Sequence, residues 1–408
     1  YGCRAELIEA LSLVSQRFSK RDARLGAVPL FIILVARRPI RVLGSDSDIE
    51  FIPYFFQADK EFTLETPTEV PVYPVALHDA ISRNLLAELS GVTLPADMDP
   101  WIQIGAGSVG SSVAYAALIR GSARHVALYD INTAKVDAEV LDLAHGTLFT
   151  GTSDITGGSD ISVAAGSHVV VITAGAKQNP GQSRIELAGV NAGILRKMLP
   201  QLLEVAPDAV YVIVTNPCDV LTVLAQEETG LPPERLFASG TVLDTSRLRW
   251  KLAQRAGVAT SSVHAHIIGE HGDTEFALWS HAMIGTVPIL DWESEGHPRM
   301  TVDELDAITV DVRDAAYKVI QGKGATNYAI GLSSARIIEA ILSDEHAVLP
   351  VSTVLKDFHG IDGVALSVPS IVNSRGAFPI RETPFSLNEL ALLRRSADAL
   401  REVAVSLR

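Results

Sequence analysis

The clearest pattern of hydrophobic and polar positions begins at Trp101, where short apolar runs alternate with longer amphipathic stretches. Short runs rich in β-branched residues predict buried strands, and the stretches between them predict helices. The predicted strands cover residues 101–104, 125–129, 168–173 and 210–215. Strands that alternate with helices form parallel sheets with helices on both faces. We therefore predict an α/β fold built on a Rossmann-type, doubly wound parallel sheet.

Beyond about residue 245 the pattern becomes a mixture of strands and helices, which predicts an α+β substrate domain. Thr301 and Glu304, and likewise Ser386 and Glu389, have the spacing of a capping box. Each pair therefore predicts the start of a helix. We expect the last helix to run nearly to Arg408.

Composition and charge exclude several classes of partner. The net charge is −14, which argues against a general nucleic-acid binder and against an anionic membrane surface. Cys3 and Cys218 have no metal-ligand spacing, so we expect neither a disulfide framework nor a metal site, and a reducing cytoplasmic setting is favoured. The longest apolar run, residues 28–36, contains Pro29 and is too short to span a bilayer.

A glycine-rich motif, Gly105-Ala106-Gly107-Ser108-Val109-Gly110, follows the first predicted strand and opens a helix. In such a motif the glycines allow a tight turn, a close approach of backbone amides to a pyrophosphate, and close packing of helix on strand. The helix N-terminus attracts phosphates. Asp130 ends the next strand, where a carboxylate accepts hydrogen bonds from ribose hydroxyls and repels a 2′-phosphate. The motif predicts NAD as cofactor, unless Asp130 merely caps the following helix.

Chemistry-bearing residues gather in the second half, in Gly269-Glu270-His271-Gly272-Asp273 and in Asp244-Thr245-Ser246-Arg247. His271 is a candidate general acid, because an imidazolium can supply the proton that an alkoxide needs after hydride transfer. Asp244 would hold the far N–H of the ring, and Arg247 offers a planar fork that matches a carboxylate. These residues predict the reduction of a small keto acid. The alternatives are a structural histidine and a helix-surface salt bridge.

Two further candidates follow predicted strands, one of them after a loop. Arg184 follows a polar loop with proline and glycine, residues 178–183, which is typical of a mobile lid that carries an arginine onto a substrate. Asn216 ends a strand at the edge of the sheet where ligands bind, and its amide is suited to the nicotinamide ribose or the substrate oxygen. The alternatives are a solvated arginine and an Asn-Pro turn.

From about residue 104 to 408 the sequence resembles the NAD-dependent L-lactate and malate dehydrogenases. The resemblance rests on the motifs above together with Ala174-Gly175-Ala176-Lys177-Gln178, Thr215-Asn216-Pro217 and Lys323-Gly324-Ala325-Thr326. It implies that His271 is the proton donor and acceptor, Asp244 its partner and Arg247 the carboxylate clamp. It further implies that Arg184 is the loop arginine, Thr326 lines the substrate pocket and Ile330 contacts the nicotinamide. The implied cofactor contacts are Gly105, Gly107, Val109, Gly110, Asp130, Thr173, Gly175, Ala176, Asn216 and Ile330.

The position that separates lactate from malate enzymes in this family is Gln178 here. A malate enzyme needs a cation at this point, because a second carboxylate buried without a charged partner costs several kcal/mol. The neutral Gln178 therefore predicts pyruvate and lactate as substrates. Malate dehydrogenase, or another 2-hydroxy acid dehydrogenase, remains the alternative.

A second resemblance concerns regulation. Asp-Thr-Ser-Arg-Leu-Arg, which ends at Arg249, and Val263-His264-Ala265 resemble bacterial lactate dehydrogenases that fructose 1,6-bisphosphate activates. The resemblance implies that Arg249 and His264 bind phosphate at a subunit interface of a homotetramer, where a bisphosphate would favour the assembled state. The alternative is that both are ordinary surface residues.

Residues 1–98 have no counterpart in that family and form, by their pattern, an extra N-terminal α+β segment of unknown role. We expect an NAD-binding domain over residues 99–243 and a catalytic domain over 244–408. One alternative is a nucleotide-binding scaffold that holds a partner through residues 1–98. The stretch up to Gly110 also resembles the front of bacterial ubiquitin-activating-like adenylyltransferase fusions, but no catalytic cysteine or zinc pair follows it.

Overall fold

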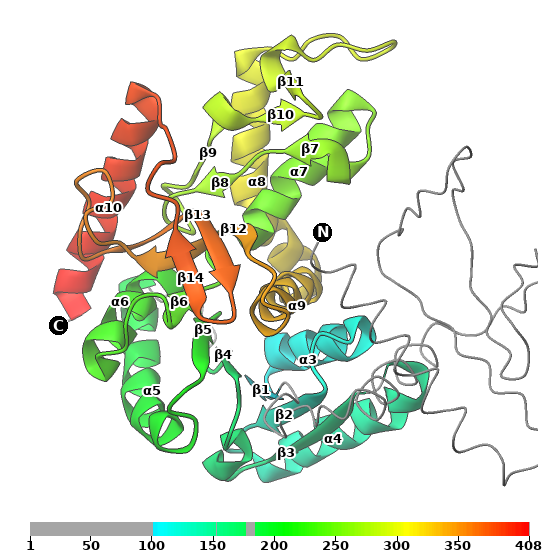
Figure 1. Cartoon of the computed structure of the whole chain (residues 1–408), viewed down its shortest axis with the longest axis vertical. Helices are drawn as coiled ribbons and strands as arrows, with labels where there is room; N and C mark the ends of the chain where they lie inside the picture. Colours follow the sequence, from blue (N-terminus) through cyan, green and yellow to red (C-terminus); the bar gives the residue numbers. More distant parts are fainter. Residues whose placement is uncertain (1–100, 152, 177–183, 408) are drawn as a thin grey trace, which may run out of the picture. The chain divides into compact units, whose positions relative to one another are not determined.

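The computed structural model describes residues 101–151, 153–176 and 184–407 of the chain (Figure 1). The sequence predictions for residues 1–98 and for the loop at 177–183 lie outside this part.

A parallel sheet occupies the first half of the described chain. Its strands are β1 (Trp101–Gly105), β2 (His125–Tyr129), β3 (Asp154–Gly158), β4 (Val169–Ile172), β5 (Val210–Ile213) and β6 (Leu236–Ala238). They lie side by side in the order β3-β2-β1-β4-β5-β6, and each neighbouring pair is parallel. Every residue of β4 and β5 is buried, because helices cover both faces, and this explains their unbroken apolar runs. The predicted doubly wound sheet is confirmed.

The second half of the chain adds strands to the same sheet. These are β12 (Ala347–Val354), β13 (Ala365–Asn373) and β14 (Gly376–Pro379). They are antiparallel to one another, and β12 joins β6 through the pair Ser352 and Ala238. The full sheet therefore has nine strands, in the order β14-β13-β12-β6-β5-β4-β1-β2-β3. The predicted α+β half thus continues the sheet of the first half.

Helices cover both faces of the sheet (Figure 1). They are α3 (Ser108–Arg120), α4 (Thr133–Gly146), α5 (Arg184–Val205), α6 (Cys218–Thr229), α7 (Val242–Ala256), α8 (Val302–Lys323), α9 (Tyr328–Leu342) and α10 (Leu387–Leu407). Alternate strand residues pack into different cores, as the pleat requires. Val169 and Val171 of β4 join the core that includes residues of α3 and α9, whereas Val170 and Ile172 join the core that includes residues of α5 and α6.

Short elements between α7 and α8 complete the second half. They are the strands β7 (Val263–His264), β8 (Ile267–Ile268), β9 (Phe276–Ala277), β10 (Met283–Ile284) and β11 (Val287–Pro288). They form two small sheets, β11-β10-β7 and β8-β9. Short 3₁₀ helices lie in this segment at Thr260–Ser262, Trp279–His281 and Ile289–Asp291, and earlier in the chain at Thr147–Phe149 and Ile161–Ala164. The connection between β8 and β9 carries the predicted catalytic histidine.

Both predicted capping boxes are present. The side chain of Thr301 accepts a hydrogen bond from the backbone of Glu304, and the Glu304 carboxylate accepts one from the Thr301 backbone. Ser386 and Glu389 make the same reciprocal pair at the start of α10. Each box satisfies amide groups that a helix start leaves without an intrahelical partner.

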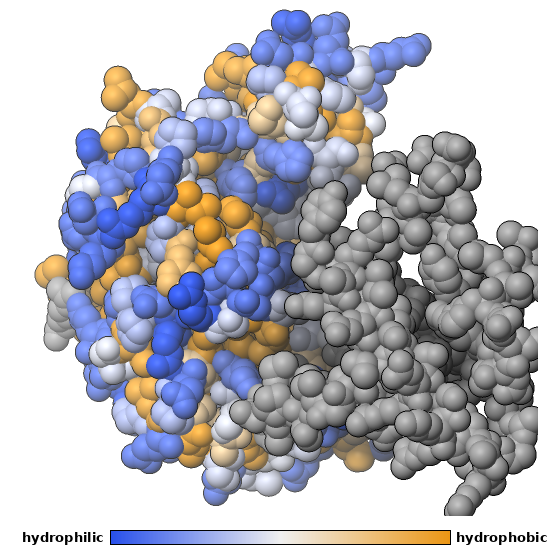
Figure 2. Space-filling view, in the orientation of Figure 1, coloured by the Kyte–Doolittle hydropathy of each residue, from blue (hydrophilic) through white to orange (hydrophobic). Residues whose placement is uncertain are grey.

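The surface mixes polar and apolar side chains. Hydrophilic residues cover much of the face in Figure 2, with hydrophobic ones in patches between them, which is ordinary for a folded protein. None of the helices in the described ranges is both long enough and apolar enough to cross a membrane.

Candidate active site

The glycine-rich loop joins β1 to α3 and leaves open space at the helix start. A Cβ atom on Gly110 would lie 1.5 Å from the carbonyl oxygen of Gly105, so helix and strand need glycine to pack here. A Cβ on Gly105 would lie 2.7 Å from the Thr173 hydroxyl. A Cβ on Gly107, the N-cap of α3, would meet nothing within 4 Å. The residues therefore fit a dinucleotide, because a phosphate can approach the helix N-terminus at Gly107.

Asp130 lies beside this loop, immediately after β2. The backbone amide of Ala106 donates to the Tyr129 carbonyl oxygen over 2.9 Å, which fixes the two strand ends together. Asp130 accepts hydrogen bonds from the Asn132 amide at 3.1 Å and from Lys135 Nζ at 3.0 Å. Asn132, not Asp130, caps α4 through its side chain. The interpretation of Asp130 as a helix cap is therefore wrong, and its place at the strand end suits a ribose.

The ends of β4 and β5 are tied together by a residue that the sequence did not single out. Asn191 of α5 is 1% exposed; its Oδ1 accepts from the Ala176 amide and its Nδ2 donates to the Asn216 carbonyl, both over 2.8 Å. Thr173, Gly175, Ala176 and Asn216 thereby lie at the same edge of the sheet as the glycine-rich loop. The only signal in the sequence was an asparagine within an apolar helical stretch.

The structure describes no side chain for two predicted residues. Gln178 lies in the loop at 177–183, outside the described residues. Arg184 is the first residue of α5, but the structure does not describe its side chain.

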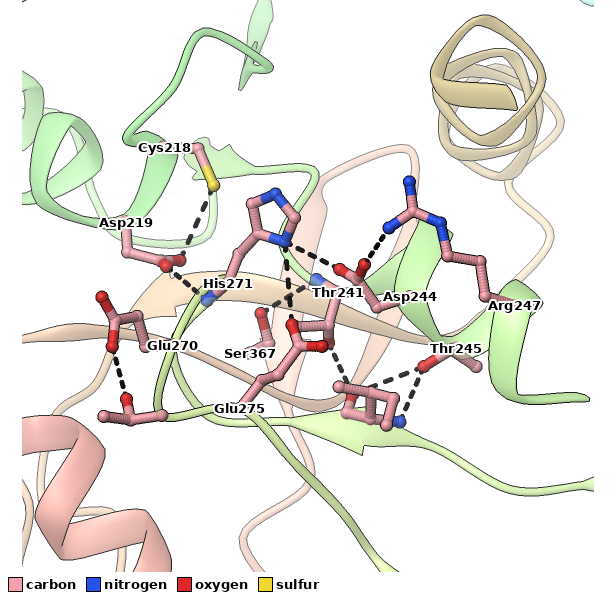
Figure 3. A network of polar contacts seen from close by, with 12 residues as sticks. Cys218, Asp219, Thr241, Asp244, Thr245, Arg247, Glu270, His271, Glu275 and Ser367 are labelled. Carbon is pink, nitrogen blue, oxygen red and sulfur yellow. Dashed lines mark hydrogen bonds and ion pairs between the residues drawn. The ribbon is translucent and has the colours of Figure 1, made fainter. Parts of the chain in front are cut away.

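His271 lies in the connection between β8 and β9 and is held at its backbone and at its ring (Figure 3). Its backbone amide donates to Asp219 Oδ2 over 2.7 Å. Its Nδ1 lies 2.7 Å from Asp244 Oδ2. Upstream, Gly269 forms a bridge to Ser367 of β13 with a φ of 92°, a conformation that favours glycine. The imidazole is therefore fixed with Nε2 turned away from Asp244.

Arg247 completes a three-residue network. Its Nη1 donates to Asp244 Oδ1 over 2.5 Å, so the Asp244 carboxylate lies between the guanidinium and the imidazole. The Asp244 side chain is 2% exposed, which contradicts the alternative of a surface salt bridge. In Figure 3 the His271 ring and the Arg247 guanidinium lie on either side of Asp244 and extend to the same side of the network. The predicted trio is thus brought together.

The charges of this network favour a protonated histidine. Burial alone would lower the pKa of His271, but Asp244 beside Nδ1, with Glu275 and Asp219 farther away, raises it to about 9. Burial also opposes ionisation of Asp244, yet His271 and Arg247 hold the pKa of its carboxyl below the usual value. The network can therefore keep His271 protonated while Asp244 remains ionised.

Two buried acids near His271 were missed by the sequence analysis. Asp219 receives the His271 amide, and burial raises its pKa to about 6. Glu275 is 5% exposed, and its Oε2 lies 4.0 Å from His271 Nδ1. Asp244, His271 and Glu275 bring ligand-type atoms within 4.8 Å of one another, a spacing that would also suit a metal ion. Because Nδ1 is already hydrogen-bonded to Asp244, we interpret the cluster as a proton-holding network.

Thr326 and Ile330 lie on the connection between α8 and α9 and on the first turn of α9. Both are half-buried, and Ile330 packs against the core that includes α3. This arrangement places the predicted nicotinamide contact on a helix that packs directly on the helix of the glycine-rich loop.

Arg249 and His264 lie on neighbouring segments. Arg249 Nε donates to the carbonyl oxygen of Ala265 over 2.9 Å, and its Nη2 lies 3.3 Å from His266 Nε2. Burial and then the Arg249 charge lower the pKa of His266 to about 4, so its ring is neutral. His264 is exposed on β7. The Arg249 guanidinium is thus held beside Ala265, the residue that follows His264.

Comparisons with known proteins identify the family. Residues 102–238 match the family model of the lactate/malate dehydrogenase NAD binding domain, and residues 241–405 match that of the lactate/malate dehydrogenase alpha/beta C-terminal domain. An L-lactate dehydrogenase of Bifidobacterium animalis subsp. lactis is 51% identical over 302 residues, which are 74% of this chain and 94% of the relative. An L-lactate dehydrogenase of Kosmotoga olearia is 44% identical, over 74% of this chain and 95% of the relative's length.

Solved structures give the same result. The ligand-bound minor L-lactate dehydrogenase of Enterococcus mundtii has a TM-score of 0.72 and 37% identity, over 76% of this chain and 99% of its own. A lactate dehydrogenase from a deep-sea metagenome library has a TM-score of 0.71 and 35% identity, over 76% of this chain and 98% of its own. The chain therefore belongs to the lactate/malate dehydrogenase family and is an NAD-dependent oxidoreductase.

Proposed function

We propose that this protein is an L-lactate dehydrogenase, which converts pyruvate, NADH and a proton reversibly into L-lactate and NAD⁺. The observation that carries the proposal is the network in which buried Asp244 joins the imidazole of His271 to the guanidinium of Arg247. Arg247 then offers a cation for the substrate carboxylate, and His271 offers a proton for the neighbouring carbonyl oxygen. The Asp244 side chain lies between these two groups. The L-lactate dehydrogenase names of the relatives support the same activity.

The residues of this chain have separate roles in the proposed reaction. Arg247 binds the substrate carboxylate with its planar guanidinium. His271 gives its Nε2 proton to the carbonyl oxygen as negative charge develops there, and Asp244 stays ionised throughout. Arg184 adds a second cation near that oxygen when the loop closes and excludes water. Bound NADH supplies the hydride. In lactate oxidation His271 takes the proton back.

The cofactor site is proposed at the edge of the sheet described above. The helix N-terminus at Gly107 would hold the pyrophosphate, with Gly105, Val109 and Gly110 completing the loop. Asp130 would accept hydrogen bonds from the ribose hydroxyls of the adenosine half. Thr173, Gly175, Ala176, Asn216 and Ile330 would hold the nicotinamide half, and Thr326 would line the substrate pocket.

The substrate choice rests on the neutral Gln178. A steady-state assay of NADH oxidation with pyruvate and with oxaloacetate tests it on the purified chain. We expect a kcat/KM at least about tenfold higher for pyruvate, because an unpaired second carboxylate costs more than the 1.4 kcal/mol that a factor of ten represents. A comparable or higher value for oxaloacetate would make malate dehydrogenase the better proposal.

A substitution in the loop sharpens this test. Gln178→Arg supplies a cation for a second carboxylate and should move the preference toward oxaloacetate. Gln182→Arg adds the same charge four positions along the same loop and should leave the preference unchanged. Equal effects of both variants would show that loop charge alone, and not position 178, sets the choice.

We further propose activation by fructose 1,6-bisphosphate at Arg249 and His264. The anchoring of Arg249 beside the residue after the exposed His264 supports a guanidinium and an imidazole near one phosphate. With the bisphosphate added, we expect a lower KM for pyruvate in the wild-type chain and a weaker response in His264→Gln. An unchanged KM in the wild type would remove this part of the proposal.

The proposed assembly is a homotetramer in the cytoplasm, without nucleic-acid or membrane partners. The acidic net charge supports the absence of nucleic-acid and membrane partners. The assembly is supported by exposed apolar side chains on α3 and α9, two helices that pack together (Figure 1). Tyr115 and Ile119 are 59% and 55% exposed on α3, and Tyr328 and Leu332 are 72% and 53% exposed on α9. Burying such area is a common driving force for subunit association. Light scattering on the purified chain measures the subunit number.

A further inference from the structure

Glu275 is a buried acid that the proposed reaction does not use. Its side chain is 2% exposed, and its Oε2 lies 4.0 Å from Nδ1 of His271. Its Oε1 is buried and has no hydrogen-bond partner in the described part of the structure. A buried carboxylate oxygen without a hydrogen-bond donor lowers the stability of the fold. Glu275 is therefore a candidate for a role in the chemistry of the neighbouring imidazole.

Charged groups from three segments surround Glu275. Asp244 and Arg247 face it from α7, His271 from the connection before β9, and Arg313 from α8. Asp244 already receives N–H donors from His271 and Arg247, so it is the better place for a negative charge. Burial first, and then the charge of Asp244, raise the pKa of Glu275 to about 8. The protonated form of Glu275 therefore persists to higher pH than that of a solvent-exposed glutamate.

We propose that Glu275 is a positioning residue for His271, whose carboxyl group, buried 4.0 Å from Nδ1, stabilises the protonated imidazole once that carboxyl ionises. The inference rests on the proposed function, in which His271 is the proton donor. A negative charge on the Glu275 carboxyl is one of the causes that raise the pKa of His271. Ionised Glu275 therefore holds the imidazole proton, which extends pyruvate reduction to more alkaline pH.

The test is the pH profile of kcat/KM for pyruvate, measured on the full-length chain and on Glu275→Gln. The variant has the same shape but cannot ionise. We expect the alkaline limb of its profile to move to lower pH by about one unit, the size expected for a charge about 4 Å away. Lactate oxidation, which needs the neutral imidazole, should begin at correspondingly lower pH.

Glu389→Gln is the matched control. As whole residues Glu275 and Glu389 are both 5% exposed, but the Glu389 carboxylate accepts hydrogen bonds from the backbone amides of Ser280 and Ser386 at the start of α10. Glu389→Gln should leave the alkaline limb in place. If Glu275→Gln loses stability but its alkaline limb does not move, Glu275 has only a structural role.

Several outcomes separate the inference from the proposed function. An unmoved alkaline limb in Glu275→Gln overturns the inference, while pyruvate turnover by the wild type still upholds the function. Absent pyruvate turnover in the wild type overturns the function itself. If Glu275→Gln does not fold, the same pH profile is measured on Glu275→Met, whose side chain also cannot ionise. An alkaline limb that moves to lower pH supports the inference, and an unmoved limb overturns it.

Discussion

At the scale of residues, the site depends on the balance between burial and neighbouring charge around His271. Burial disfavours the imidazolium, and the carboxylates beside it favour the same form more strongly, so the pKa rises to about 9. Arg247 in turn keeps Asp244 ionised. A histidine with this proton affinity is a donor at physiological pH and becomes an acceptor only after it has lost its proton to substrate or solvent.

The same shift predicts how activity depends on pH. Pyruvate reduction needs protonated His271, so its kcat/KM should stay level up to about pH 9 and fall tenfold per unit above it. Lactate oxidation needs the neutral ring and should rise through the same region. Stopped-flow or steady-state rates with each substrate measure both limbs, and an alkaline limb below pH 7 would contradict this assignment.

Stability should follow the sign of the same shift. The folded chain holds the His271 proton more tightly than the unfolded chain, whose histidine has a pKa of 6.5. The resulting stabilisation is complete below pH 6.5 and is lost as the pH rises through about 9. It amounts to roughly 3 kcal/mol. Glu275, with its pKa raised to about 8, acts in the same direction. Urea unfolding at pH 6.5 and 9.5 should give a lower free energy of unfolding at the higher pH; an equal or higher value contradicts the prediction.

The residues that the sequence predicted are those with a local signal. Asp244 and Arg247 share a helix face three residues apart, and glycines flank His271. Asp219 and Glu275 carry no such signal, and Asn191 carries only its place in an apolar stretch, because acids and amides are most often exposed. Their importance comes from tertiary burial next to His271 or between two strand ends, which no spacing along the chain reveals.

At the scale of elements, continuous apolar runs identified the parallel strands because both faces of the sheet are covered. The predicted strand ends lie within two residues of those observed for β1, β2, β4 and β5. The addition of β12, β13 and β14 to the same sheet was not predicted. It depends on the contact between Ser352 and Ala238, over a hundred residues apart, and such pairing has no local pattern.

The capping box of α8 allows a direct test at this scale. Thr301→Ala removes the hydroxyl that accepts from the Glu304 amide, and should lower the free energy of unfolding by about 1 kcal/mol. Thr301→Ser keeps the hydroxyl and should remain close to the wild type. Urea denaturation measures all three proteins. Equal stability of the alanine variant and the wild type would mean that the cap contributes nothing here.

At the scale of the whole molecule, the described site lies entirely within the unit from Asp99 to Arg408. The family models match within the same range, from residue 102 to residue 405. Each predicted site residue that the structure describes is there, including the glycine-rich loop and His271. We therefore expect the chemistry to need no catalytic group from residues 1–98.

A truncated chain tests this division. We predict that a chain beginning at Asp99 reduces pyruvate with a kcat within about twofold of the full chain, because a domain with its own core folds alone. Light scattering on both proteins shows whether residues 1–98 change the assembly. A collapse of turnover with the fold intact would assign residues 1–98 a part in catalysis. Unchanged turnover with loss of a bound partner would favour the scaffold alternative.

The measurement that tests the account most directly is the rate of NADH oxidation with pyruvate by His271→Gln beside the wild type. Glutamine retains polarity but cannot donate a proton in the manner of an imidazolium, so kcat/KM should fall by about a thousandfold. NADH binding should stay near the wild-type value, because the glycine-rich loop and Asp130 are untouched. A variant that keeps its rate within about tenfold of the wild type would show that His271 is not the proton donor.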